Sequence, residues 1–327
     1  MDQRTIQTLF ALLRSAICGT KLTDEERGAY SREQLPDLMK MAQRHDVAHL
    51  LALGLKQNAL LAKEDRDIAK RILEAVYRYE RLNYEYTQVC SALESAQIPF
   101  IPLKGSVLRK HYPEAWMRTS CDIDILVHGE DLNEAISYLI NHLQYVEKER
   151  TPHDVSLLSP RGNHVELHFD LVEEGRANNA INVLRSAWEN VSLRENSDYW
   201  YEMTDAFFYF YHIAHMAKHF ENGGCGIRPF IDLWLLDRID GAEQKERDRV
   251  LEEGGLSAGA GVAVKGVAAQ KIRQRFQCGN EIFKYTDMTD RDLAAAIFAF
   301  NLYRTVDMFG IDDPFPVAEL HPGVEDL

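Results

Sequence analysis

Residues 98–127, with the sequence IPFIPLKGSVLRKHYPEAWMRTSCDIDILV, contain the pattern that decides the fold. The apolar run Ile98–Leu103 predicts a strand, Lys104-Gly105-Ser106 predicts a tight turn, and Val107–His111 predicts the start of a helix. A turn of this kind directs free backbone N–H groups and the positive end of a helix dipole at one place, which favours an anion such as phosphate.

The end of the stretch, Asp122–Val127, predicts a second strand in which acidic and apolar residues alternate. Successive side chains point to opposite faces of a strand, so Asp122 and Asp124 share one face. Two neighbouring carboxylates repel each other and are costly to desolvate on an otherwise apolar strand. A bound divalent cation would remove that cost.

A third acid follows about 40 residues later. After an expected helix, Gly129–His142, the sequence predicts three more strands, with a Pro-Gly turn making a hairpin of the last two; they are Gln144–Glu149, Asp154–Leu158 and His164–Leu171. Glu166 lies in the last strand between Val165 and Leu167, with His164 and His168 on its own face. One sheet can therefore bring the three carboxylates together.

The regions on either side of these strands have helical periodicity. The expected fold class is α+β: a mixed sheet flanked by helices, with a helical region at 1–97, a catalytic core at 98–200, and a helical region and tail at 201–327. The expected helices are Thr5–Cys18, Glu33–Gln43, Val47–Leu60 with a cap at Asp46, Lys63–Ala96, Ala177–Ala187, Thr204–Phe220 capped by Thr204, Pro229–Arg238, Ala242–Glu253, Ala258–Phe276 and Arg291–Met308. The residues from Gly310 onward are expected to form an arm or a loose tail.

Composition limits the classes of partner. The chain has 327 residues, 46% of them hydrophobic, and a formal net charge of −14, so most of its surface repels nucleic acid and anionic membranes. Its five cysteines are widely spaced and lack metal-type pairing, which is typical of reduced thiols. No secretory cleavage pattern or membrane-spanning run is evident. The sequence predicts a soluble cytoplasmic protein without a membrane partner.

The order of these motifs resembles that of the polymerase-β-like nucleotidyltransferase superfamily. More narrowly, Leu103-Lys104-Gly105, Tyr112, Arg118, the Asp122–Leu126 segment and Glu166-Leu167-His168 are similar to a largely uncharacterised bacterial nucleotidyltransferase family. The similarity spans roughly residues 40–240. It implies that Asp122 and Asp124 hold two Mg²⁺ ions, with Mn²⁺ as an alternative, that Glu166 completes the site, and that Gly105-Ser106 cradles the nucleotide phosphates. The 15 residues between Ser106 and Asp122 slightly exceed the usual spacing of the superfamily.

Positive charge for the triphosphate is expected from Lys104 and Arg118, with Arg109 and Lys110 as weaker candidates. An alternative for Arg118 is that it pairs with Asp122 or Asp124 and only holds them in place. For His168 we favour a buried or supporting role over direct catalysis.

Three histidines share one face of a predicted helix, because His212, His215 and His219 are three and four residues apart. The helix lacks the adjacent glutamate of a zinc-peptidase motif, so a zinc site is disfavoured. The open alternatives are helix packing and a cleft wall that contacts base, ribose or acceptor. In the second case the predicted cleft residues are His168, His215, His219, Arg228 and Asp232.

The predicted function is Mg²⁺-dependent transfer of a nucleoside monophosphate from an NTP, with ATP as one candidate donor, to an acceptor hydroxyl. Small molecules, protein hydroxyls and RNA ends all remain open as acceptors, whereas duplex DNA is disfavoured by the net charge. Two alternatives remain: a catalytically silent nucleotide- or partner-binding protein of the same fold, and a metal-dependent phosphoesterase that uses His164, Glu166 and His168.

Overall fold

The computed structural model describes residues 3–172, 179–221, 226–239 and 244–254. The order of elements alternates between helices and strands only in the middle of the chain. The helices are α1 (Gln3–Cys18), α2 (Asp24–Ala29), α3 (Leu35–Arg44), α4 (Ala48–Gln57), α5 (Arg66–Ser95), α6 (Lys104–Leu108), α7 (Leu132–Leu143), α8 (Asn179–Arg185), α9 (Asp205–Glu221), α10 (Arg228–Leu236) and α11 (Gln244–Glu253). The strands are β1 (Phe100–Pro102), β2 (Asp122–Val127), β3 (Val146–Arg150), β4 (Asp154–Leu158), β5 (His164–His168), β6 (Val191–Leu193) and β7 (Tyr201–Met203).

The central sheet has the strand order β1-β2-β5-β4-β3. Strands β2 and β5 are parallel, and every other neighbouring pair in this sheet is antiparallel, so the sheet is mixed. The α+β class expected from the sequence is therefore confirmed. The small sheet of β6 and β7 was not predicted, because three-residue strands are too short to show an alternating pattern.

The two faces of the central sheet differ in chemistry, because side chains alternate along each strand. One face is apolar and is covered by α5 and α7; its strand residues include Ile123, Ile125, Val127, Val155, Leu157, Val165 and Leu167. On the opposite face, Ile101 and Leu126 pack in a cluster with residues of α9. Asp124 and Glu166 lie on this second face, directly beside each other in register.

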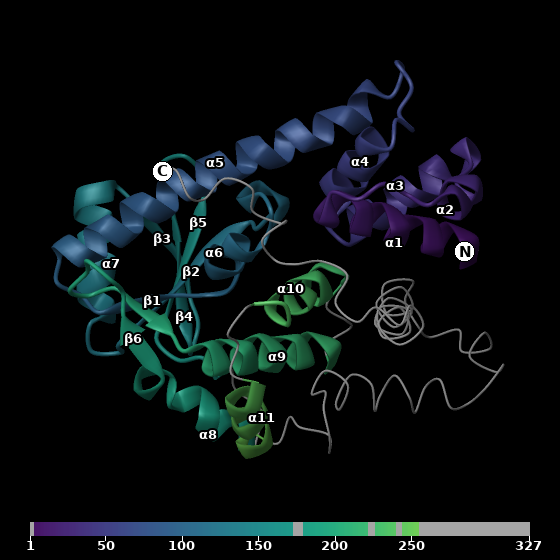
Figure 1. Cartoon of the computed structure of the whole chain (residues 1–327). Helices are drawn as coiled ribbons and strands as arrows, with labels where there is room; N and C mark the ends of the chain where they lie inside the picture. Colours follow the sequence, from purple (N-terminus) through teal and green to yellow (C-terminus); the bar gives the residue numbers. More distant parts are fainter. Residues whose placement is uncertain (1–2, 173–178, 222–225, 240–243, 255–327) are drawn as a thin grey trace.

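Helix α5 connects the N-terminal helices to the sheet. It runs along the sheet at one end and reaches α4 at the other, where α1 to α4 gather (Figure 1). Leu82, Val89 and Leu93 bury its inner face against the sheet. The N-terminal helices also share an apolar cluster with α10 through Phe230 and Ile231. These helices therefore pack against α10 as well as against α5.

Two local predictions were wrong. Asp46 does not cap α4: the capping position is Val47, no side chain makes a cap bond there, and the Asp46 carboxylate accepts a hydrogen bond from Thr119 Oγ1 at 3.0 Å. Gly105 and Ser106 do not form a turn before a helix, because α6 begins at Lys104 and contains both residues. The Thr204 cap is confirmed, since Thr204 Oγ1 accepts from the Phe207 N–H at 3.4 Å.

Helix α2 was also not predicted, although its start carries a recognisable signal. The Thr23 hydroxyl accepts from the Glu26 N–H, and the Glu26 carboxylate accepts from the Thr23 N–H, which makes a capping box. The expected helices Ala258–Phe276 and Arg291–Met308, and the tail from Gly310, lie outside the described residues. Among the residues that are described, no helix is both long and apolar enough to cross a bilayer.

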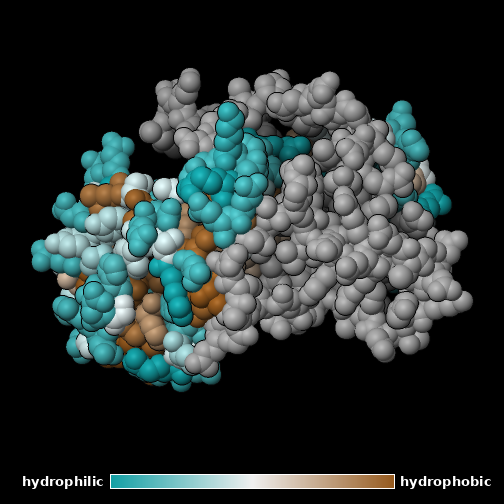
Figure 2. All heavy atoms as spheres, turned by 90° about the horizontal axis from the view of Figure 1, so that it is seen from below, coloured by the Kyte–Doolittle hydropathy of each residue, from teal (hydrophilic) through white to brown (hydrophobic). Residues whose placement is uncertain are grey.

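The apolar residues of the described chain are mostly enclosed in three buried clusters. On the face shown in Figure 2, hydrophilic residues cover much of the described surface, and hydrophobic residues appear between them. The most exposed large apolar side chains are Leu73 and Tyr77 of α5, at 69% and 65%. They lie on the part of α5 that precedes its contact with the sheet.

A close contact between α1 and α4 gives the first prediction. A Cβ at Gly54 would collide with the main chain of Leu12, lying 2.9 Å from its carbonyl carbon. We expect Gly54→Ala to lower the free energy of unfolding by about 1–3 kcal/mol, because main-chain atoms cannot yield without moving α1. Urea denaturation followed by circular dichroism measures this change.

The matched control is Gly28→Ala in α2, where an added Cβ meets nothing within 4 Å. Alanine has the better helix propensity there and should stabilise by up to about 1 kcal/mol. Equal stability of the Gly54→Ala protein and the unchanged protein would contradict the proposed collision.

Candidate metal and nucleotide site

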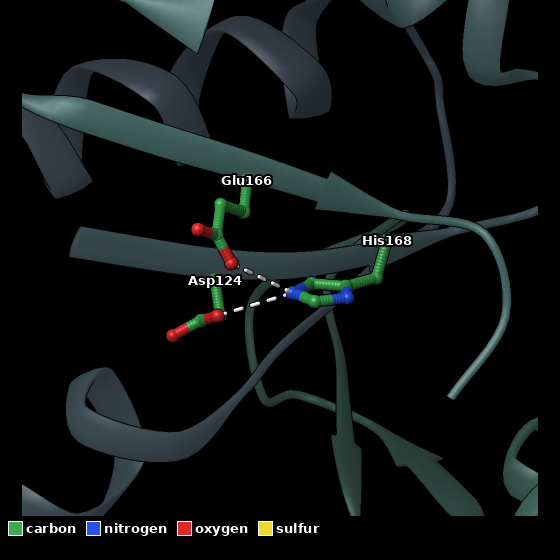
Figure 3. A group of neighbouring side chains, drawn as sticks. All are labelled: Asp124, Glu166 and His168. Atoms are coloured by element: carbon green, nitrogen blue, oxygen red, sulfur yellow. Dashed lines mark hydrogen bonds and ion pairs between the residues drawn. The ribbon is translucent and has the colours of Figure 1, made fainter. Parts of the chain in front are cut away.

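The parallel pairing of β2 with β5 brings three polar side chains together. Asp124 pairs with Glu166, and Leu126 pairs with His168, so the acids and the histidine occupy one face. One ligand-type atom from each of Asp124, Glu166 and His168 lies within 4.8 Å of the others. Figure 3 shows Asp124 on β2 and both other residues on β5, with the His168 ring linked to each carboxylate. Carboxylate oxygens and imidazole nitrogen are suitable ligands for a divalent cation.

Asp124 is the most constrained of the acids. It is 2% exposed, and its Oδ1 atom accepts from Lys104 Nζ at 2.7 Å and lies 3.0 Å from His168 Nε2. Burial favours the neutral carboxylic acid, but Lys104 and His168 outweigh that effect and hold the pKa of Asp124 well below its usual value. Asp124 is therefore ionised and fixed in place.

His168 responds to the same contacts. Its burial disfavours the imidazolium, but hydrogen bonds with Asp124 and Glu166 outweigh burial and raise the pKa of His168. Its Nε2 atom lies 3.5 Å from Glu166 Oε2. His168 thus contacts both carboxylates from a position two residues after Glu166 on β5, and its supporting role stays a prediction.

Asp122 lies near this group but outside it. It pairs with His164, one step toward the start of both strands. Burial, followed by the negative charges of Asp124 and Glu166, raises the pKa of Asp122 to about 6. The three acids therefore share one electrostatic environment, as the strand pattern predicted, although His168 rather than Asp122 completes the group of close ligand atoms.

Lys104 has an unusual backbone conformation. Its φ angle is +44°, a left-handed value that costs a residue with a side chain on the order of 1–3 kcal/mol and is often found at functional sites. In this conformation Lys104 Nζ lies 2.7 Å from Asp124 Oδ1, and about three quarters of the lysine side chain is buried. The sequence singled out Lys104 as a charge, but no local signal predicted this conformation.

Gly105 and Ser106 have different surroundings. A Cβ on Gly105 would lie 3.0 Å from the Ser120 Cβ and 3.4 Å from an Arg118 nitrogen, so a glycine permits close approach of α6 to the segment that enters β2. The Ser106 hydroxyl oxygen is buried without a hydrogen-bond partner among the described residues. Ser106 lines a cavity that Asp124, Glu166 and His168 do not line. Phosphate binding by these two residues stays a prediction.

Arg118 forms a buried ion pair with an acid other than Asp122, Asp124 and Glu166. Its Nε atom donates to Asp232 Oδ1 at 2.8 Å, and the Tyr112 hydroxyl donates to the same oxygen at 2.7 Å. The Arg118 and Asp232 side chains are 7% and 0% exposed. Burial opposes ionisation of Asp232, but Arg118 and His212 outweigh it and lower the pKa of Asp232. The structure therefore pairs Arg118 with Asp232, where the sequence had suggested Asp122 or Asp124.

The weaker cationic candidates also have partners. Arg109 is buried, and its Nε atom donates to the Gly105 carbonyl at 3.1 Å. Lys110 is exposed and lies 4.0 Å from Glu202. Arg228 forms an ion pair with Asp46, which joins the turn between α3 and α4 to the start of α10. The sequence contained no signal for this link, because its residues are far apart in the chain.

The histidines of α9 divide into two groups. His212 is buried, with Nε2 3.0 Å from the Pro229 carbonyl oxygen, so it packs α9 against α10. His215 and His219 lie with their Nε2 atoms 3.0 Å apart. Burial and then the Lys104 charge lower the pKa of His215 well below its usual value, which places His215 in the field of the acid site. Within the described part of the chain, neither belongs to a three-residue metal-type group.

Comparisons with known proteins identify the family of this chain. Residues 31–254 match the model of a family described as "Uncharacterised nucleotidyltransferase". This protein belongs to that family of nucleotidyltransferases, which confirms the resemblance noted in its sequence. No curated protein matches significantly. One solved structure that matches is that of the antibiotic-resistance factor ANT(2'')-Ia, with a TM-score of 0.39 and 11% identity over 52% of this chain and 92% of that chain.

The raised pKa of Asp122 gives a pH-dependent prediction. Because the folded pKa of about 6 lies above the ordinary 3.8, the ionised carboxylate costs stability that grows as pH rises from about 4 to 6. We expect Asp122→Asn to raise the free energy of unfolding at pH 7 by about 3 kcal/mol in EDTA, and the gain to vanish near pH 4. Denaturation curves across this pH range measure the effect.

The control for this experiment is Asp198→Asn, which makes the same chemical change at an exposed position. It should alter stability by less than about 0.5 kcal/mol at every pH. A gain for Asp122→Asn that is the same at pH 4 and pH 7 would refute the electrostatic cause.

A third prediction concerns cation binding. We expect Glu166→Gln to weaken Mn²⁺ binding at least about tenfold. Loss of a residue that only hydrogen-bonds a metal ligand already weakens binding about tenfold, so loss of a ligand should cost at least as much. Glu149→Gln, the same substitution on the exposed strand β3, should leave the affinity unchanged. Electron paramagnetic resonance of free Mn²⁺ reports the affinity directly. Equal affinities for the two variants would exclude Glu166 as a ligand.

Proposed function

We propose that this protein transfers a nucleoside monophosphate from an NTP to an acceptor hydroxyl and releases pyrophosphate. The observation that carries the proposal is the in-register pairing of Asp124 with Glu166 on adjacent parallel strands. Lys104 forms an ion pair with the buried Asp124 carboxylate. Membership of a nucleotidyltransferase family supports the same reaction class.

The donor set suits Mg²⁺ and also Mn²⁺, because Asp122, Asp124 and Glu166 offer carboxylate oxygens on one face of the sheet. Burial is the largest cause of the raised pKa of Asp122, and the negative charges of Asp124 and Glu166 add to it. A divalent cation bound by these acids would polarise the phosphate and stabilise the charge that develops during transfer. We propose that the three acids hold the metal.

The proposed reaction forms one bond, breaks one bond and releases one proton. The acceptor oxygen forms a bond to the α-phosphorus, the bond from that phosphorus to the bridging oxygen breaks, and pyrophosphate leaves with the electron pair. We assign the acceptor proton to Glu166, because its side chain is 31% exposed, whereas that of Asp124 is 3% exposed. Glu166 is therefore the carboxylate that an acceptor can reach.

Lys104 is the proposed contact for the triphosphate, since its ammonium group is already at the acid site and α6 begins with it. Gly105 and Ser106 follow it directly and remain the proposed backbone contacts. We propose a positioning role for Arg118: with Asp232 and Tyr112 it holds the chain just before β2 in place. We propose that His215 lines the cleft on the α9 side, because the Lys104 charge, after burial, contributes to the lowered pKa of His215.

The acceptor class follows only in part from charge. A formal net charge of −14 disfavours duplex DNA, whose binding depends on neutralising many phosphates. Small molecules, protein hydroxyls and RNA ends are each compatible with a partly exposed Glu166. The donor is tested first with all four NTPs, ATP included.

The test is pyrophosphate release from the four NTPs in Mg²⁺, with a lysate fraction as the source of acceptor. We expect Asp124→Asn to lower the rate at least about 100-fold, because the buried carboxylate holds both Lys104 and the metal. Glu149→Gln is the matched control and should retain the full rate. Nucleotide binding without turnover would support the silent alternative, and hydrolysis of a phosphate ester without NTP would support the phosphoesterase.

A further inference from the structure

Lys104 binds the carboxylate that a divalent cation would bind. Its Nζ atom lies 2.7 Å from Asp124 Oδ1, and His168 Nε2 lies 3.0 Å from the same oxygen. Asp124 also belongs, with Glu166 and His168, to the group whose ligand-type atoms lie within 4.8 Å of one another (Figure 3). An ammonium group of the protein itself is therefore already in contact with the candidate metal site.

The lysine and a divalent cation would compete for Asp124. A cation bound to Oδ1 at about 2 Å would lie within about 5 Å of Lys104 Nζ, because Nζ is 2.7 Å from that oxygen. Like charges at this separation repel each other strongly where burial lowers the effective dielectric, and Asp124 is 2% exposed. Either the lysine or the cation can neutralise Asp124 well, but the two together cannot.

Lys104 is the partner that can move away. Its side chain is 24% exposed, whereas that of Asp124 is 3% exposed. A lysine carries its charge at the end of a flexible four-carbon stem, so its ammonium group can turn toward solvent without a shift of the main chain. Its left-handed φ of +44° is a conformation that clusters at ligand clamps and switch regions. His168 would keep its contact with Asp124 after the lysine had left.

We propose that Lys104 is a stand-in cation that gives way when a divalent cation binds. In the metal-free protein the ammonium group neutralises Asp124; in the loaded protein it turns to the triphosphate, so Asp124 holds the lysine and the cation in turn. No covalent bond forms or breaks. The triphosphate part rests on the proposed function. The consequence for regulation is that the site disfavours a free cation and favours one that arrives with the nucleotide.

The sign of one effect separates this role from a structural one. If Lys104 only held Asp124 in place, removal of its charge would weaken cation binding. If Lys104 competes with the cation, removal of its charge strengthens cation binding. Binding of the metal–nucleotide complex should change in the opposite direction, because the lysine is then a contact for the triphosphate.

Electron paramagnetic resonance of free Mn²⁺, without nucleotide and near neutral pH, tests the proposal on the full chain. We expect Lys104→Met and Lys104→Gln to bind Mn²⁺ at least about tenfold more tightly than the unchanged protein, a typical size for coupling between two sites. Lys104→Arg keeps the charge and should bind no more tightly. None of the three substitutions introduces a β-branched side chain, so the backbone conformation is equally accessible to them.

The matched control is Lys148→Met, which removes a lysine charge on the exposed strand β3 and should leave the Mn²⁺ affinity unchanged. Thermal denaturation gives a second readout that needs no turnover. Mn²⁺ should raise the Tm of Lys104→Met by more than it raises that of the unchanged protein, because Asp124 has then lost its ammonium partner. If Lys104→Met does not fold, the comparison of Lys104→Gln with Lys104→Arg carries the same test.

Isothermal titration calorimetry with the Mg²⁺ complex of a nonhydrolysable ATP analogue measures the opposite effect. We expect Lys104→Met to weaken this binding at least about tenfold, since it removes a charged partner of the phosphates. Tighter Mn²⁺ binding by Lys104→Met without nucleotide binding by any variant would support the exchange at Asp124 and count against the proposed transfer reaction.

Three results would overturn the proposal. The first is Mn²⁺ affinity in Lys104→Gln that is equal to or lower than that of the unchanged protein, which would make the lysine a structural support. The second is equally tight Mn²⁺ binding by Lys104→Gln and Lys104→Arg, which would exclude charge as the cause. The third is unchanged binding of the Mg²⁺–nucleotide complex by Lys104→Met, which would show that the displaced lysine does not turn to the triphosphate.

Discussion

The structure of the site depends on one buried negative charge, the carboxylate of Asp124. A carboxylate with so little contact with water is stable only if neighbouring groups neutralise it. Lys104 and His168 do so through the same oxygen atom, and they come from α6 and β5 respectively. The charge on β2 therefore fixes the position of two other elements around it. Because the lysine also has a left-handed backbone, its position is specified by the fold as a whole and not by local preference.

Several elements could be predicted because their signals are local. Strand β2 has the predicted bounds, Asp122–Val127. Acidic and apolar residues alternate at its start, which is the pattern of a strand whose two faces have different surroundings. β4 was predicted with its observed bounds because Pro160 and Gly162 mark the turn of its hairpin with β5. The sequence also predicted that one sheet could bring Asp124 and Glu166 together. It did not predict that β2 and β5 are parallel neighbours, because that pairing depends on tertiary packing.

Other features could not be predicted because they join distant parts of the chain. Arg118 was expected to bind phosphate or a nearby acid, yet its carboxylate partner is 114 residues away on α10. Asp46 looked like a helix cap, but it bonds to Thr119 and Arg228. A short polar side chain at a helix start is compatible with either role, and only the tertiary arrangement decides between them. The same limit applies to His168, whose face was predictable but whose two carboxylate contacts were not.

The packing of α5 has a consequence for the modularity of the chain. Leu82, Val89 and Leu93 close one side of the sheet, and they precede the first strand in the sequence. A fragment that starts at residue 98 would keep α7 but expose the part of this face that α5 covers, and such surfaces promote aggregation. Swapping the strand-bearing segment alone into a relative would therefore fail, and the smallest portable unit must include the long helix in front of it.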